Sequence, residues 1–289
     1  QLGDAPILLD LPLDKPRPKV QTTNGSTVSR ALPEVLTQEL KALCEQQGVT
    51  LFMATLLAWQ VLLSRFSGQK DVVVGVPSLG RHAPELENII GFFIQSLVFR
   101  SKFDNNPLIE GALQQVKQTV LDGFSNGDVP VDKIVEHLSI PRSSAYSPLV
   151  QVAFQLLDNA DFNASEMVGN ASIGGMEIEV VGGQTASAKF DLTLNLTLNG
   201  NQLSASLEYN TDLFQDNTAE FLLEGFERVC QQFVNNLQQP LTNISIVAEP
   251  DLLSALGLDP TECECVQPLS RMQHDMFLDS LVNPDSLQS

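Results

Sequence analysis

The sequence predicts an α+β fold, in which helices pack against a mixed β-sheet. A first observation is the stretch 51–67, whose apolar residues surround the predicted helix almost completely, as expected of a helix deep in a core. A second is DVVVGV at 71–76, a continuous β-branched run typical of a strand covered on both faces. A third is the period-two alternation at 190–198 and 203–209, which predicts two further strands. In chain order, the elements fit an α+β or an α/β layer fold.

Before the core helix, the chain predicts a connector, a β element and a first helix. Residues 9–18 are broken by three prolines and are interpreted as an extended connector. Residues 20–32 are polar and β-branched, which predicts a strand, or a hairpin turning at Asn24 and Gly25. Apolar residues at helical spacing then predict a helix over 33–47, ended by the glycine that follows it.

The remaining elements and the domain boundaries follow from the same patterns. Further strands are expected at 97–99, 149–156, 173–181 and 244–247, and further helices at 107–124, 129–138 and 217–237. Asn199 and Gly200 predict a hairpin turn between the two alternating strands. After Glu249 the character changes: a short helix is expected at 252–258, an acidic stretch follows at 259–264, and a second helix is expected at 269–281. The predicted units are therefore a domain at 1–248, a linker at 249–265 and a separate segment at 266–289.

Charge and composition exclude several classes of function. Apolar residues make up 43% and charged residues 18%, a balance that indicates a globular chain. The net charge is −19 and the basic residues form no stripe, so neither nucleic acid nor an anionic membrane is an expected partner. The apolar stretch 51–63 is too short for a membrane span, and the acidic N-terminus does not resemble a signal peptide. We therefore expect a reduced, cytoplasmic protein.

The cysteines and histidines do not predict a metal site. Cys44 and Cys230 fall on apolar helical faces, where a thiol packs as a small hydrophobe. Cys263 and Cys265 form a lone CxC pair, and three histidines far apart in the sequence offer no second ligand pair. Neither a metal nor a directly bound cofactor is expected.

Several segments carry motifs that occur together, in this order, in one protein family. They are LDLPLDKPRP (9–18), VVVGVPSLGRHAPELENIIGFFIQSLVFR (72–100), NGDVPVDKIVEHL (126–138), PRSSAYSPLVQVAFQL (141–156), AKFDLTLNL (188–196) and LEYNTDLF (207–214). Together they resemble the C-terminal half of the condensation domains of nonribosomal peptide synthetases. A last segment, VQPLSRMQHDMFLDSLVNPDS (266–286), is similar to the opening of a second condensation-type domain, with its Ser-x-x-Gln core at Ser270 and Gln273.

The resemblance implies a fold and a reaction. The fold would be a chloramphenicol-acetyltransferase-like lobe, one of two in a V with a tunnel between them. Carrier proteins would deliver phosphopantetheine-tethered substrates, and the acceptor amine would attack the donor thioester. The family's catalytic His-His-x-x-x-Asp belongs to the N-terminal lobe, and none of the three histidines here, His82, His137 and His274, forms it. The segment that should carry it would precede Gln1, so no catalytic residue is expected in this chain, and whether the chain acts as an enzyme stays open.

The glycine-led motif supplies the candidate tunnel residues. Gly91 would let the backbone approach a tethered thioester while Phe92 and Phe93 exclude water. An equal interpretation is that the two rings are ordinary core aromatics before a strand. Gln95 stands where the family often has Asn, which keeps the amide but lengthens it, and Ser96 completes the set. Gln95 is interpreted either as a tunnel amide or as a solvated amide at a strand end.

Three further charged residues are candidates for a defined role. Arg30 and Arg81 are candidates for pairing with an acid of the N-terminal lobe. Arg81 has the alternative of pairing with Glu85 or Glu87 in its own loop. For Asp191 we favour a structural role at a strand end over catalysis, because such carboxylates commonly satisfy backbone donors.

The expected partners follow from the family. They are carrier-protein domains that bring the phosphopantetheine, neighbouring synthetase domains and the N-terminal condensation lobe. Because carrier proteins are usually acidic too, docking is expected to use apolar contacts, with local help from a residue such as Arg142. The alternative is a condensation-like domain that no longer condenses and recruits a tailoring enzyme. The Gln at position 95 and the second condensation-type start motivate it. A free-standing acyltransferase is a third interpretation.

Overall fold

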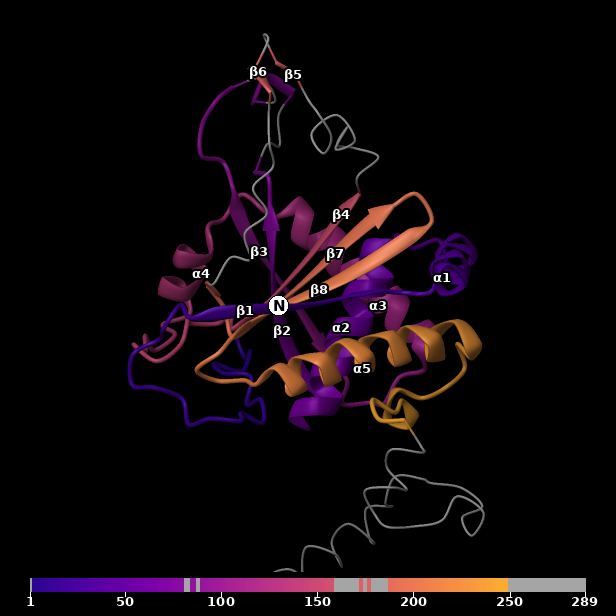
Figure 1. The fold of residues 1–289 in the computed structure, drawn as a ribbon. Helices are drawn as coiled ribbons and strands as arrows, with labels where there is room; N and C mark the ends of the chain where they lie inside the picture. Colours follow the sequence, from indigo (N-terminus) through magenta and orange to yellow (C-terminus); the bar gives the residue numbers. More distant parts are fainter. Residues whose placement is uncertain are drawn as a thin grey trace, which may run out of the picture. The chain divides into compact units, whose positions relative to one another are not determined.

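The computed structural model describes residues 2–80, 84–86, 89–158, 172–173, 176–177 and 187–248 (Figure 1). Its main compact unit is Gln1–Ile246. The predictions for residues 249–289, namely the linker, the CxC pair and the second condensation-type start, lie outside the described residues and stay predictions.

The unit is built on a six-stranded mixed sheet with the order β1-β8-β7-β4-β2-β3. Its strands are β1 (Gly25–Ala31), β2 (Asp71–Ser78), β3 (Gln95–Lys102), β4 (Val152–Asp158), β7 (Leu192–Asn199) and β8 (Gln202–Asn210). The β2–β4 and β4–β7 pairs are parallel, whereas the β1–β8, β7–β8 and β2–β3 pairs are antiparallel. The predicted mixed sheet is confirmed, and residues 20–32 form a single strand rather than a hairpin because β1 pairs with β8 along its length.

Helices cover both faces of this sheet. They are α1 (Glu34–Gln47), α2 (Leu51–Ser67), α3 (Ile109–Ser125), α4 (Val131–His137) and α5 (Asp216–Asn235), with short 3-10 turns η1 (Pro84–Leu86) and η3 (Leu241–Asn243). Side chains of β2 alternate between two clusters. Val72 and Val74 join the main core with α1, α2, α3 and α5, while Val73 packs with Val135 of α4 on the other face. This alternation is the period-two geometry of a strand buried on both faces.

The core helix α2 is positioned by its two ends. The Thr50 hydroxyl accepts a hydrogen bond from the Met53 N–H at 3.2 Å, and Gly68 ends the helix in the left-handed region, with φ of 73°. Between them, the run from Met53 to Leu63 is buried almost without interruption. Cys44 of α1 and Cys230 of α5 are buried free thiols, as predicted, and burial raises the pKa of Cys44 to about 11.

Two turns differ from the sequence-based expectation. The β7–β8 register pairs Asn199 with Gln202, so the turn residues are Gly200 and Asn201 rather than Asn199 and Gly200. Gly200 has φ of 58°, which a glycine adopts without steric cost at the first position of a two-residue hairpin. The predicted strand over 173–181 is instead a pair of two-residue antiparallel strands, β5 (Ser172–Ile173) and β6 (Met176–Glu177), in its described part. Two glycines separate these strands in the sequence, and such a pair favours a turn.

The predicted last strand, at 244–247, is wrong. Ile244 is fully buried, but the backbone that follows it bonds to side chains of α5 and not to a sheet. Gln232 accepts from the Ser245 N–H at 3.0 Å and donates to the Ser245 carbonyl at 2.8 Å, and Arg228 donates to the Ile246 carbonyl. A glutamine side chain thus satisfies the peptide groups that a neighbouring strand would otherwise bond.

In the part of the chain that the structure describes, no single helix is long and apolar enough to span a membrane. α1 and α2 taken together reach that length and composition, but they are bent by 107° at their junction.

Candidate functional site

The glycine-led motif lies in the connection between β2 and β3. Ser78, the last residue of β2, pairs with Gln95, the first residue of β3, and Pro77 pairs with Ser96. The intervening residues 79–94, called the motif loop from here on, rise beyond the end of the sheet in their described parts (Figure 1). The two strands therefore present the motif at one end of the sheet.

The motif loop exposes an unusual amount of apolar surface. Phe92 is 90% exposed and Ile90 is fully exposed. The large apolar residues that the loop exposes, called the apolar rim from here on, are Leu79, Ile89, Ile90, Phe92 and Ile94. Several exposed apolar residues in one loop make it a candidate interaction site, because large exposed apolar patches on soluble proteins usually mark such sites. The rim therefore distinguishes this loop from the rest of the unit.

The two phenylalanines of the motif lie in different environments. Phe92 is exposed, whereas Phe93 is half-buried. A Cβ on Gly91 would lie 2.9 Å from the Phe93 ring, and one on Gly80, whose φ is 64°, would lie 1.9 Å from the Phe93 carbonyl oxygen. Both glycines thus let the chain pack closely around Phe93. The interpretation of both rings as core aromatics fails for Phe92, because its side chain meets solvent.

Gln95 carries an unsatisfied acceptor. The side chain is half-buried, and its Oε1 is shielded from solvent and has no hydrogen-bond partner among the described residues. Leaving a buried polar atom unpaired costs about 1–3 kcal/mol, so such atoms are uncommon in folded proteins. The alternative of a solvated strand-end amide does not fit an Oε1 that solvent does not reach.

Ser96 connects the motif to a cavity on the flank of β3. The cavity has a volume of about 430 Å³ and lies between the start of β3, the end of α3, α4 and the start of the chain. Its walls are mainly apolar, with Leu97 and Val98 of β3 facing Val129 and Ile134. Ser96 is exposed at its edge. The five predicted tunnel residues therefore lie just before or at the start of β3, and Ser96, the last of them, lines the edge of this cavity.

Of the two arginines proposed for a lobe contact, the structure describes only Arg30. Arg30 of β1 pairs with two glutamates of α5, at 3.0 Å from Glu224 and 2.8 Å from Glu227. Arg81 lies outside the described residues, as does His82. A contact of either arginine with another lobe stays a prediction, and for Arg30 it would have to displace two ion pairs.

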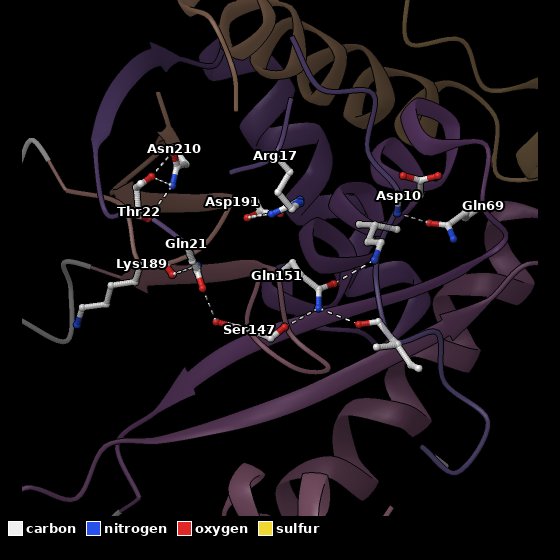
Figure 2. Close-up of polar contacts among 12 residues, drawn as sticks. Asp10, Arg17, Gln21, Thr22, Gln69, Ser147, Gln151, Lys189, Asp191 and Asn210 are labelled. Carbon is white, nitrogen blue, oxygen red and sulfur yellow. Dashed lines mark hydrogen bonds and ion pairs between the residues drawn. The ribbon is translucent and has the colours of Figure 1, made fainter. Parts of the chain in front are cut away.

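A second polar site lies at the other end of the parallel strands, where the connector crosses the sheet (Figure 2). Arg17 of the connector forms two hydrogen bonds with Asp191, at 2.9 and 2.5 Å. The Asp191 carboxylate is fully buried, and the Arg17 guanidinium also stacks on Tyr146, 5.9 Å from the ring centroid. A buried ion pair of this geometry needs both partners, since either charge alone would be uncompensated. The structural interpretation of Asp191 fits this arrangement.

Gln151, which precedes the neighbouring strand β4, forms hydrogen bonds with the start of the connector. Its Oε1 accepts from the Leu9 N–H at 3.0 Å, and its Nε2 donates to the carbonyls of Ile7 at 3.0 Å and Ser147 at 2.7 Å. The backbone reaches Gln151 through a tight turn, in which Leu149 has φ of 68° and the Val150 N–H donates to the Pro148 carbonyl. Positive φ at a leucine is strained, and it persists here where Leu149 is buried in the core.

Asn210 completes this arrangement at the end of β8. Its Nδ2 donates to the Thr22 carbonyl at 2.8 Å, and its Oδ1 accepts from the Asp212 N–H at 2.9 Å. Gln151 precedes β4, Asp191 precedes β7 and Asn210 ends β8, so three neighbouring strands each hold the N-terminal segment, the first two at the connector and the third at Thr22 just after it. These three residues and their partners are called the connector network from here on. The roles of Arg17, Gln151 and Asn210 were missed from sequence, although all three lie within the motif segments or the connector.

With the fold and the site described, the family can be stated. A family model for the condensation domain matches residues 3–251. The chain belongs to the condensation domain family. A linear gramicidin synthase of Brevibacillus parabrevis is 39% identical over 251 residues, covering 86% of this chain and 5% of that protein. This condensation domain is thus of the nonribosomal peptide synthetase type, and it spans only a small part of such a relative's length.

Solved structures share the condensation-domain fold. Holo-AB3403, a four-domain nonribosomal peptide synthetase bound to AMP and glycine, has a TM-score of 0.79 at 23% identity, covering 86% of this chain and 20% of that chain. The X-domain in its complex with OxyB from teicoplanin biosynthesis has a TM-score of 0.73 at 24% identity, covering 85% of this chain and 53% of that one. The predicted chloramphenicol-acetyltransferase-like α+β fold is therefore confirmed.

Proposed function

We propose that this condensation domain supplies one wall of the tunnel in which an amine attacks a carrier-bound thioester, and that the motif loop forms this wall. The observation that carries the proposal is the unpaired Oε1 of Gln95 beside the exposed apolar rim. The Gln95 Oε1 lacks a hydrogen-bond donor among the described residues, and the apolar rim is exposed to solvent. Both features fit a surface that a substrate or a second lobe covers. In the X-domain complex this chain matches about half of the solved chain, so a second lobe is available in the family to cover such a surface.

The chemistry gives Gln95 a defined role. A carbonyl acceptor binds an N–H, and both an acceptor amine and the amides of a phosphopantetheine arm carry one. In the reaction, the amine nitrogen bonds to the thioester carbonyl carbon, the carbon–sulfur bond breaks, and the proton lost by nitrogen ends on the thiol. Gln95 orients the N–H partner, while the apolar rim excludes water that would hydrolyse the thioester.

The other components come from partners. Phosphopantetheine enters on carrier proteins, no cofactor is bound by the chain itself, and the base of the His-His-x-x-x-Asp motif comes from the N-terminal lobe. The isolated 289-residue polypeptide is therefore expected to form no amide bonds from carrier-bound thioesters. A single-turnover assay with the isolated chain checks this, and measurable product would contradict the assignment of the base to another lobe.

The decisive experiment changes Gln95 in the complete synthetase. Gln95→Ala should lower the single-turnover rate of amide formation about tenfold, the effect of one lost hydrogen bond to the reacting group, with little change in stability. Gln231→Ala, at an exposed position of α5, is the matched control and should leave the rate unchanged. Gln95→Asn should recover part of the rate, because it keeps the amide. An unchanged rate for Gln95→Ala, or unfolding with a normal rate per folded molecule, would refute the tunnel role.

A second candidate function is a platform that recruits a tailoring enzyme. The observation that favours it is the fold similarity to an X-domain solved in complex with OxyB, together with an apolar rim able to bind a protein. The same assay separates the two functions. If the folded synthetase forms no amide at this domain, while Phe92→Ser abolishes binding of the tailoring enzyme, the platform is correct and the tunnel role is not.

A further inference from the structure

A small cavity lies where α2 ends, far from the motif loop. Its volume is about 110 Å³, and it is bounded by the last turn of α2, the start of β2, the β3–α3 connection and η3. The residues around it are Val61, Ser64, Arg65, Gly68, Lys70, Phe103, Asn106, Leu241 and Thr242. Lys70 immediately precedes β2, whereas the motif loop follows its last residue. Eight residues of strand separate the two sites by about 25 Å, so the cavity is not part of the proposed tunnel.

Two cations at this cavity have no anionic partner. Among the described residues, neither the Arg65 guanidinium nor the Lys70 ammonium forms an ion pair or a side-chain hydrogen bond. Both residues are exposed, and what sets them apart from other cations without an ion pair in the described chain, such as Arg142, is that they line one cavity. The arginines that are ion-paired in the described part of the chain are Arg17, Arg30, Arg100 and Arg228. Partial burial of the guanidinium lowers the pKa of Arg65, because the charged form loses solvation and no paired carboxylate compensates for it.

A neutral donor adds to the two charges. The Oδ1 of Asn106 accepts from the Thr242 N–H at 2.9 Å, which uses the acceptor side of its amide and leaves the NH₂ group as a donor. The Ser64 hydroxyl already donates its proton to the Gln69 carbonyl at 2.6 Å, so it is not counted as a donor to a ligand. The cavity therefore combines a guanidinium, an ammonium and an amide NH₂. An oxyanion accepts hydrogen bonds from all three kinds of group, and a guanidinium matches phosphate geometry with two parallel bonds.

We propose that this cavity is a binding site for a phosphate group. Its two positive charges match a phosphate dianion, and its volume suits a small ion rather than a drug-sized ligand. A simpler role for Arg65 would be to offset the negative end of the α2 dipole, since it lies in the last turn of that helix. That role explains neither Lys70 nor the cavity. The proposal does not depend on the tunnel role of the motif loop.

The test is calorimetric titration of the full chain with inorganic phosphate at constant ionic strength. Saturable binding is expected, and Arg65→Gln and Lys70→Gln should each weaken it about tenfold or more, the effect of losing a charge-assisted hydrogen bond. Arg142→Gln and Lys19→Gln are the matched controls, because they remove the same charges from residues that are exposed like Arg65 and Lys70 but lie outside the cavity. Equal weakening by the controls would mean a general charge effect and would overturn the site, as would no saturable binding of phosphate to the unaltered chain.

Two further measurements identify the ligand. Acetate should bind much more weakly than phosphate, and equal affinity would overturn the preference for phosphate. Phosphopantetheine should compete with inorganic phosphate, and binding more than about tenfold tighter would identify a tethered arm rather than free phosphate as the source. If Arg65→Gln lowers thermal stability but leaves phosphate affinity unchanged, Arg65 serves the helix dipole and the proposal fails.

Discussion

The two ends of the sheet differ in whether their side chains are buried and hydrogen-bonded within the chain. At the connector network, Asp191 is fully buried, Gln151 makes three hydrogen bonds, and Asn210 bonds to the Thr22 carbonyl from the neighbouring strand. At the motif loop, Phe92 is 90% exposed, and the shielded Oε1 of Gln95 has no partner in the part of the chain that the structure describes. Each of these polar groups in the first region is satisfied within the chain, which is what stability requires. The second region exposes apolar side chains and leaves a polar atom without a partner among the described residues. Both features are expected of a surface that a partner covers.

The largest effect should come from the ion pair of the connector network. Asp191→Ala leaves the Arg17 guanidinium without its carboxylate in a largely buried position, so the free energy of unfolding should fall by about 3–5 kcal/mol. Urea denaturation measures this change. Glu224→Ala, which breaks two more exposed pairs, with Arg30 and with Arg228, should cost less than about 1 kcal/mol. Similar costs for the two variants would remove the distinction between a buried network and the surface.

A smaller loss is expected from Gln151→Ala. The change leaves the buried Leu9 N–H and the Ser147 carbonyl without partners, at a cost of about 1–3 kcal/mol. Gln155→Ala, four residues further along β4 at a half-buried position, is the control and should cost less. Hydrogen exchange would show the difference directly, because only Gln151→Ala should raise the exchange rate of the Leu9 amide. A change in stability without faster exchange at Leu9 would contradict the assignment.

Acid should weaken contacts that hold the N-terminal segments to the sheet. Hydrogen bonds from Arg100 and then Lys102 hold the pKa of Asp4 well below its usual range. Those from Thr22 and Asn24 lower the pKa of Asp212. Because both pKa values are depressed in the folded state, this stabilisation is present above about pH 4 and is lost as the pH falls toward the folded-state values. Urea denaturation at decreasing pH should show a falling free energy of unfolding, with a weaker dependence in Asp4→Asn. An identical pH profile in this variant would refute the linkage.

The smallest effect on stability is expected in the apolar rim. Phe92→Ser should change the free energy of unfolding by less than about 0.5 kcal/mol, since the ring is already in water. Phe93→Ser should cost more, because this neighbouring ring is half-buried against Gly91. Thermal denaturation of the two variants separates them. A large loss in Phe92→Ser would mean that the ring supports the fold, and the contrast between the two ends of the sheet would then be wrong.

Local patterns predicted most of the secondary structure. Thr50 and Gly68 bound α2 at the limits of the predicted helical stretch 51–67, and the alternating strands and their hairpin were located to within a residue or two. The failures are informative. Residues 244–247 have strand-like side chains, but Gln232 and Arg228 bond to their backbone first. A sequence pattern reports what the side chains favour and not which distant group reaches the peptide bonds.

The candidate site was predicted in part for the same reason. Gly91, Phe92, Phe93, Gln95 and Ser96 were found because a contiguous motif carries them. The different environments of Phe92 and Phe93 could not be foreseen, since they depend on how the loop turns at Gly80. The Arg17–Asp191 pair joins residues 174 positions apart, and the phosphate cavity joins α2 to η3. No local pattern encodes separations of that size.

The fold class, the family and the position of the motif follow from the sequence alone, because they depend on periodicity and on residues adjacent in the chain. Which polar groups are satisfied and which remain open is set only when the chain has folded. Burial and hydrogen bonding are properties of side chains brought together from distant segments, and their energies depend on the surroundings that folding creates. Gln151, just before β4, and Gln95, at the start of β3, are the same residue type in similar local settings. Yet one is fully bonded, and the other has an acceptor without a partner.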